Sequence, residues 1–94
     1  MNAQEKLREA ARLIEERAQQ RDRAGGERSM AATVAAFNAI YGTGLTEVQG
    51  WHFMELLKMS RAAGGRYIAD DYDDKIAYAA LAAEAAALNI PAAR

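Results

Sequence analysis

Residues 46–57 read TEVQGWHFMELL and contain the clearest helix start in the chain. Thr46 and Gln49 have the spacing of a capping box, in which the threonine hydroxyl accepts from the Gln49 amide and the glutamine side chain reaches back. The apolar residues that follow point in nearly all directions around the helix axis, as expected of a helix buried on more than one side. We therefore expect a helix over residues 47–62 at the centre of the fold.

A second helix is predicted over about residues 30–41, before this central segment. Ser29 stands where its N-cap is expected, and Gly42 and Gly44 follow its end. One apolar face recurs there at helical spacing, formed by Met30, Val34, Phe37 and Tyr41.

The two outer segments of the chain also have helical patterns. Residues 3–20 carry a narrow apolar stripe on a charged helix, and residues 71–89 form a largely alanine helix that Asp70 or Asp71 is expected to cap. Small side chains let helix backbones approach closely, so the alanine helix has a tight packing surface. The stripe of the first helix consists of Leu7, Ala11, Ile14 and Ala18, and the face of the last consists of Tyr72, Ile76, Ala79 and Ala83.

Length and composition limit the architecture. A chain of 94 residues forms one domain, and a domain this short is only marginally stable by itself. It contains no cysteine and a single histidine, which excludes disulfides and a thiolate zinc site and makes a structural metal unexpected. Self-association is the remaining way to stabilise it. The sequence predicts a compact, all-α, four-helix domain with short glycine-containing turns that assembles as a homo-oligomer.

Charge and hydropathy exclude several classes of partner. The net charge of −1 argues against binding to a nucleic-acid polymer, which favours a strong basic excess. No apolar run reaches the length of about 18 residues that spans a membrane. The first residues are charged and helical in pattern rather than typical of a signal peptide. We expect a cytoplasmic protein with no cofactor.

The segment around Gly25-Gly26-Glu27-Arg28-Ser29 is a candidate anion site. It places a glycine pair, an arginine and a serine at the start of a helix, where free backbone N–H groups favour a phosphate. Arginine matches phosphate oxygens in bidentate fashion, so Arg17, Arg21 and Arg23 are candidate clamps. A capped helix after a charged loop explains the same pattern without a ligand.

An acidic cluster at the start of the last helix is a candidate metal site. Asp71 and Asp74 are three residues apart on one face and are candidate ligands for a hard cation such as Mg²⁺, with Glu55 as a further ligand. Capping and compensation of the helix dipole explain the cluster without a metal and are the favoured interpretation. The remaining residues of the cluster are Asp70 and Asp73.

Aromatic residues and the single histidine give weaker signals. His52 has no serine, cysteine or aspartate partner in sequence and is a poor catalytic candidate. Trp51, Phe53 and Tyr41 have helical spacing and are interpreted as core residues, although aromatic rings also stack on bases. Tyr67 and Tyr72 flank a glycine-rich turn and are freer to meet a ligand.

Longer stretches resemble a family of small bacteriophage proteins, the anti-CBASS sponges, which evade host immunity by sequestering cyclic oligonucleotide second messengers. The resemblance covers most of the chain after residue 25. It is carried by Gly26–Met30, Val34–Asn38, Leu45–Glu47, Gly50–Lys58 and Asp70–Glu84.

The resemblance implies a helical protein that assembles as a hexamer and binds cyclic di- or trinucleotides, such as cyclic GMP–AMP, without cleaving them. The setting it implies is the cytoplasm of an infected bacterium. It favours phosphate binding by Arg28, Ser29 and Thr33, and it implies Arg66 as the arginine of a separate trinucleotide pocket. With Arg17 and Tyr72 from the residue patterns, these are the expected ligand-binding residues. Where the family has a basic residue early in the second helix, this chain has Ala31 and Ala32.

Two other functions remain open at this point. An all-α nucleotide pyrophosphatase would use paired Glu/Asp motifs on two helices to bind Mg²⁺; Asp71 and Asp74 supply one such pair, and a second is missing. An oligomeric interaction module without a ligand would use the alanine helix as its interface. The absence of a catalytic constellation favours binding over catalysis, so we expect no enzyme activity.

Overall fold

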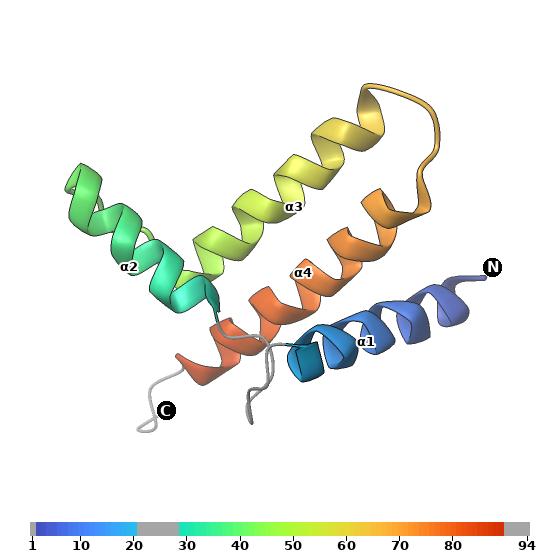
Figure 1. Ribbon diagram of the computed structural model, residues 1–94, viewed down its shortest axis with the longest axis horizontal. Helices are drawn as coiled ribbons and strands as arrows, with labels where there is room; N and C mark the ends of the chain where they lie inside the picture. Colours follow the sequence, from blue (N-terminus) through green and yellow to red (C-terminus); the bar gives the residue numbers. More distant parts are fainter. Residues whose placement is uncertain (1, 21–28, 90–94) are drawn as a thin grey trace.

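Four α-helices account for nearly all of the chain that the computed structural model describes, residues 2–20 and 29–89 (Figure 1). No strand occurs in these residues. The number and class of the elements agree with the sequence prediction, and the last helix begins two residues earlier than predicted. The helices are α1 (Ala3–Gln20), α2 (Ser29–Tyr41), α3 (Glu47–Ala63) and α4 (Ala69–Leu88).

Helix α4 is the centre of the fold. It runs antiparallel to α3 on one side and lies along α1 on the other, whereas α2 extends away from the beginning of α3 (Figure 1). The prediction that α3 is central and buried on more than one side is wrong, because Phe53 is 70 % exposed and Leu56 is 57 % exposed. The buried residues of α4 outnumber those of every other helix and are Asp71, Asp73, Asp74, Ala77, Leu81, Ala82 and Ala85.

The buried face of α4 differs from the predicted one. Tyr72, Ala79 and Ala83 are exposed, whereas Ala77 and Leu81 on another face are buried. Alanine occurs on all sides of this helix, so apolar periodicity carries little information about its orientation. The ion pairs made by its aspartates, described below, fix the orientation instead.

The helix ends follow the sequence signals in one case and not in another. At α3 the predicted capping box is confirmed: the Gln49 amide donates to Thr46 Oγ1 over 3.1 Å, and the Thr46 amide donates to Gln49 Oε1 over 2.9 Å. At α4 the predicted aspartate cap is wrong, because the N-cap is Ile68 and no described side chain bonds there. Asp70 and Asp71 lie in the first turn, where their charge suits the helix dipole.

One side chain organises the turn between α2 and α3. The Asn38 amide donates to the Leu45 carbonyl over 2.9 Å, and its oxygen accepts from the Leu45 amide over 2.9 Å and from the Thr43 hydroxyl over 2.7 Å. Gly42 has a φ of 65°, in the left-handed region that glycine adopts readily. The turn is therefore held by its own residues.

Helix α2 packs on α3 through its first half only. Met30 joins a core cluster with Trp51 and Leu81, and Val34 packs against that cluster. Of the predicted apolar face, Phe37 and Tyr41 remain exposed. Among the described residues, no helix is both long and apolar enough to cross a membrane.

Candidate functional site

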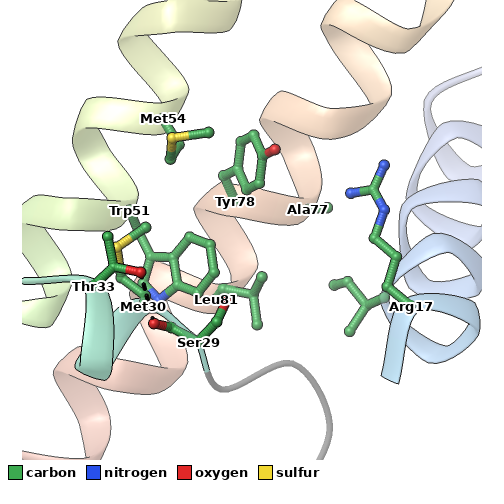
Figure 2. A pocket seen from close by; sticks show the side chains of 10 residues that line it. Arg17, Ser29, Met30, Thr33, Trp51, Met54, Ala77, Tyr78 and Leu81 are labelled. Atoms are coloured by element: carbon green, nitrogen blue, oxygen red, sulfur yellow. Dashed lines mark hydrogen bonds between the residues drawn. The ribbon is translucent and has the colours of Figure 1, made fainter. Parts of the chain in front are cut away.

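A hollow of about 360 Å³ lies where residues of all four helices meet (Figure 2). We refer to it as the Arg17 pocket. Arg17 lies on one side of it, and the first turn of α2 lies on the other (Figure 2). Its lining residues are Ile14, Arg17, Ser29, Met30, Thr33, Trp51, Met54, Ala77, Tyr78 and Leu81.

Two stacked aromatic rings form one wall of the Arg17 pocket. The ring centroids of Trp51 on α3 and Tyr78 on α4 are 5.8 Å apart, with an interplanar angle of 23°. Offset stacking of this kind stabilises aromatic pairs. Trp51 is buried, as expected of a core residue, and it also lines the pocket. The wall is therefore rigid and presents flat apolar surface.

The charge at the pocket comes from three side chains on three helices, which we refer to as the Asp74 triad. Arg17 Nη2 on α1 lies 2.8 Å from Asp74 Oδ1 on α4, and Lys58 Nζ on α3 lies 2.9 Å from Asp74 Oδ2. Two cations share one carboxylate, so the triad carries a net charge of +1 at neutral pH. The Arg17 side chain is 37 % exposed and is the part of the triad that lines the pocket.

The contacts of the triad shift the pKa values of Asp74 and Arg17. Burial alone would raise the pKa of the Asp74 carboxyl, but the hydrogen bonds from Lys58 and Arg17 outweigh it and leave that pKa below its ordinary value. Burial likewise opposes the charge of Arg17, and the hydrogen bond to Asp74 reverses the effect and raises the pKa of its guanidinium. Both shifts favour the charged forms of Arg17 and Asp74, as an anion site with a fixed cation requires.

Two hydroxyl residues on one turn of α2 complete the polar part of the pocket. Thr33 Oγ1 donates to the Ser29 carbonyl over 2.9 Å (Figure 2). An anion approaching Thr33 would compete with this bond for the hydroxyl proton. The structure makes Ser29, the predicted N-cap, the first residue of α2. The first-turn N–H groups of α2 still lie at this end of the helix.

The structure brings together some of the predicted ligand-binding residues and separates others. Arg17 on α1 and Ser29 and Thr33 on α2 line one hollow. Arg28, together with the rest of residues 21–28, lies outside the described residues. Arg66 is exposed in the connection between α3 and α4, at the far end of these helices from α2 (Figure 1).

Tyr72 belongs to a different hollow of about 480 Å³, which Lys6, Leu7 and Tyr67 also line. The rings of Tyr67 and Tyr72 stack with centroids 5.7 Å apart. The hydrogen bond to Asp73 raises the pKa of Lys6, and a hydrogen bond to Tyr67 acts in the same direction. Tyr72 is therefore not part of the Arg17 pocket.

Two aspartates of the acidic cluster of α4, Asp73 and Asp74, make ion pairs. Lys6 Nζ lies 3.0 Å from Asp73 Oδ1, and Asp74 holds the two cations of its triad. Glu55, the proposed additional metal ligand, lies 4.0 Å from His52 Nε2 on its own helix. Among the described residues, no three carboxylate or histidine side chains gather in a way that suits a metal ion.

One known protein family matches most of this chain. The family model for a domain of unknown function, DUF6378, matches residues 5–86. The chain belongs to the DUF6378 family. The matched region includes every residue that lines the Arg17 pocket. Neither the curated proteins nor the solved structures contain a match to this chain.

Sequence reasoning missed Tyr78, which lines the Arg17 pocket, and the roles of Lys58 and Asp74 in the Asp74 triad. Lys58 is seven residues after Trp51 and therefore shares its helix face, a signal that places a lysine on the buried side of α3. Tyr78 lies next to Ala79, a residue of the predicted face, and the apolar pattern did not point to Tyr78 itself. Asp74 was considered only as a metal ligand or dipole partner, because nothing in the sequence links it to Arg17, 57 positions away.

Proposed function

We propose that this DUF6378 protein binds a cyclic oligonucleotide second messenger, such as cyclic GMP–AMP or a cyclic trinucleotide, and sequesters it without cleavage. One base and a neighbouring phosphate of the ring would occupy the Arg17 pocket. The observation that carries the proposal is that a partly exposed arginine, two hydroxyl residues and a stacked aromatic wall line the same hollow.

The Asp74 triad supports the phosphate half of this proposal. An isolated buried carboxylate would repel a phosphate, but here two cations surround it and the net charge is positive. Arginine holds phosphate oxygens through two parallel N–H donors. Because Asp74 fixes the guanidinium in advance, little side-chain entropy is lost when a phosphate binds.

The apolar walls support the base half. Met30, Met54 and Leu81 surround the Trp51–Tyr78 pair, and flat bases bind to aromatic and apolar surface of this kind. The volume of about 360 Å³ lies near the lower end of the range of about 300–1,000 Å³ for ligand pockets. A ring with two or three nucleotides would therefore place one unit inside and the rest at the opening.

The local chemistry favours binding over hydrolysis. The carboxylate nearest to Arg17 is Asp74, whose pKa is lowered by Lys58 and Arg17 after burial is offset. A carboxylate with a lowered pKa is a poor proton acceptor for activating water. The described residues that line the pocket include no carboxylate and no histidine. This supports a sponge over a Mg²⁺-dependent pyrophosphatase.

Exposed apolar side chains support the assembly that such a sponge requires. Ile40 is 74 % exposed and Tyr41 is 68 % exposed, and contiguous apolar surface of this kind is typical of interaction sites. The proposal includes a homo-oligomer, with a hexamer expected from the resemblance to phage sponges. It also places the protein in the cytoplasm of an infected bacterium.

Calorimetry with cyclic GMP–AMP and cyclic tri-AMP tests the function directly. Arg17→Lys keeps a cation beside Asp74 but loses the bidentate fork, so we expect affinity to fall about tenfold to a hundredfold. Arg8→Lys is the matched control, because Arg8 is an exposed arginine on the same helix that does not line the pocket. Its affinity should equal that of the wild type.

The fate of the ligand separates the sponge from its rivals. The complex is freed of unbound nucleotide, heated, and the released material is identified by mass spectrometry. Intact cyclic nucleotide supports sequestration. Linear products in the presence of Mg²⁺ would show a hydrolase, and the absence of binding heat for either nucleotide would leave an interaction module without a ligand.

A further inference from the structure

The segment from the start of α2 to the start of α3 differs in charge from the rest of the chain. Residues 29–46 contain no Asp, Glu, Lys, Arg or His, and all charged residues lie outside them. Most of α2 is nevertheless exposed in the protomer. A helix without charge on any side is normally covered by protein, so this surface requires an apolar partner.

A groove between α2 and α3 lies on the same side as these exposed residues. Its volume is about 250 Å³, and its lining is apolar apart from one threonine. Phe37 and Phe53 form part of it, and the Phe37 ring lies against the Tyr41 ring in a tilted arrangement, with centroids 4.8 Å apart. The ribbons of α2 and α3 diverge from each other, so the two helices form a V (Figure 1).

We propose that α2 of a second copy of this chain occupies this groove and that the contact shapes the Arg17 pocket. The absence of charge in residues 29–46 selects an equally uncharged partner, because an acidic or basic surface would lose hydration there without gaining an ion pair. Apolar side chains that project and a groove that accepts them lie on one face. This is the self-complementarity that a two-fold contact between identical chains needs.

The link to the ligand pocket is a shared wall. Met30, Thr33 and Met54 line both the α2–α3 groove and the Arg17 pocket. Methionine side chains are flexible and adapt to the space around them. When a neighbouring helix fills the groove, these side chains have less freedom, and the opposite surface of the wall becomes fixed. Self-association and binding in the Arg17 pocket are therefore coupled; this coupling to a ligand rests on the proposed function.

Two variants change the groove contact without touching the Arg17 pocket. Ile40→Lys alters the helix that is inserted, and Phe53→Lys alters the groove that receives it; both side chains are at least 70 % exposed in the protomer, so the fold should persist in far-UV circular dichroism. Burying an unpaired charge should weaken self-association about 100-fold in sedimentation velocity. Leu7→Lys is the matched control on α1 and should assemble like the wild type.

Trp51 reports on the coupling without any ligand. It is the single tryptophan of the chain, and it lines the Arg17 pocket but not the groove. Acrylamide quenching of its fluorescence should increase when the wild type is diluted until it dissociates and in Ile40→Lys. It should stay unchanged in Leu7→Lys. The affinity for cyclic GMP–AMP should fall in Ile40→Lys in parallel with dissociation.

The outcomes separate this inference from the proposed function. A monomeric wild type, or dissociation by Leu7→Lys rather than by the two groove variants, would overturn the groove contact. Equal Trp51 quenching in assembled and dissociated protein would overturn the coupling. If no form binds cyclic nucleotide while Ile40→Lys dissociates the assembly and unmasks Trp51, the proposed ligand is wrong and the coupled contact stands.

Discussion

Helices α1 and α2 are attached to the α3–α4 pair by different chemistry. Helix α1 is held by ion pairs from Lys6 and Arg17 to two buried carboxylates of α4, with Ala10 buried between them. Helix α2 carries no charge and crosses α3 at Gly50, where its side chains fill the space that a Cβ would need. Ion pairs specify one partner within the protomer, whereas the apolar surface of α2 remains available to a second copy.

The largest expected effect comes from removing the carboxylate charge that holds α1 on α4. Asp74→Asn removes the charge that Lys58 and Arg17 share, and the Lys58 side chain is only 11 % exposed. Leaving a buried charge unpaired is strongly destabilising, so we expect the free energy of unfolding to fall by about 3 kcal/mol. Urea denaturation followed by far-UV circular dichroism measures it. Asp70→Asn, at an exposed position on the same helix, should stay near the wild type, and equal stability of the two variants would contradict the role of the triad.

A smaller loss of stability is expected when the contact between α2 and α3 is disturbed. A Cβ at Gly50 would overlap the Met30 sulfur and lie 2.8 Å from Val34 Cγ1, so Gly50→Ala forces α2 away from α3. Overpacking of this kind lowers the free energy of unfolding by about 1–3 kcal/mol. Gly65→Ala is the control, because nothing lies within 4 Å of its added Cβ. If both glycine variants melt at the wild-type temperature, α2 is not fixed at this crossing.

The smallest expected effect is the pH dependence of the stability that Asp74 contributes. The pKa of Asp74 is lowered in the fold, since hydrogen bonds from Lys58 and Arg17 outweigh the opposing effect of burial. A carboxyl of this kind stabilises the fold above its unfolded pKa, about 3.9, and the stabilisation is lost as the pH falls through the folded pKa. The difference in free energy of unfolding between wild type and Asp74→Asn should therefore stay constant above about pH 5 and shrink as the pH falls below about 4. A constant difference would show that other groups control acid unfolding.

Local signals predicted the helices well because they depend on neighbours in sequence. The capping box of Thr46 and Gln49 located the start of α3, and the glycine at position 42 located the end of α2. The orientation of α4 was not predictable in this way. Its alanines are nearly equivalent on every side, and its buried face is selected by Lys6, Arg17 and Lys58 from two other helices.

The candidate site was predictable only in part for the same reason. Arg17 and Ser29 were singled out by residue type and Thr33 by the family resemblance, and the fold brings them to one pocket. Tyr72 was singled out by its place beside a turn, and it lies in another hollow. The ion pair between Arg17 and Asp74 joins residues 57 positions apart, and no local pattern encodes such a contact.

The Asn38 side chain has a consequence for the position of α2. Its carboxamide closes the turn with bonds to Leu45 and Thr43, so the end of α2 is tied by hydrogen bonds to the residues just before α3. At the other end of α2, Met30 meets α3 at Gly50 and belongs to the core cluster of Trp51. Helix α2 is thus anchored at both of its ends, by polar contacts at one and by apolar contacts at the other.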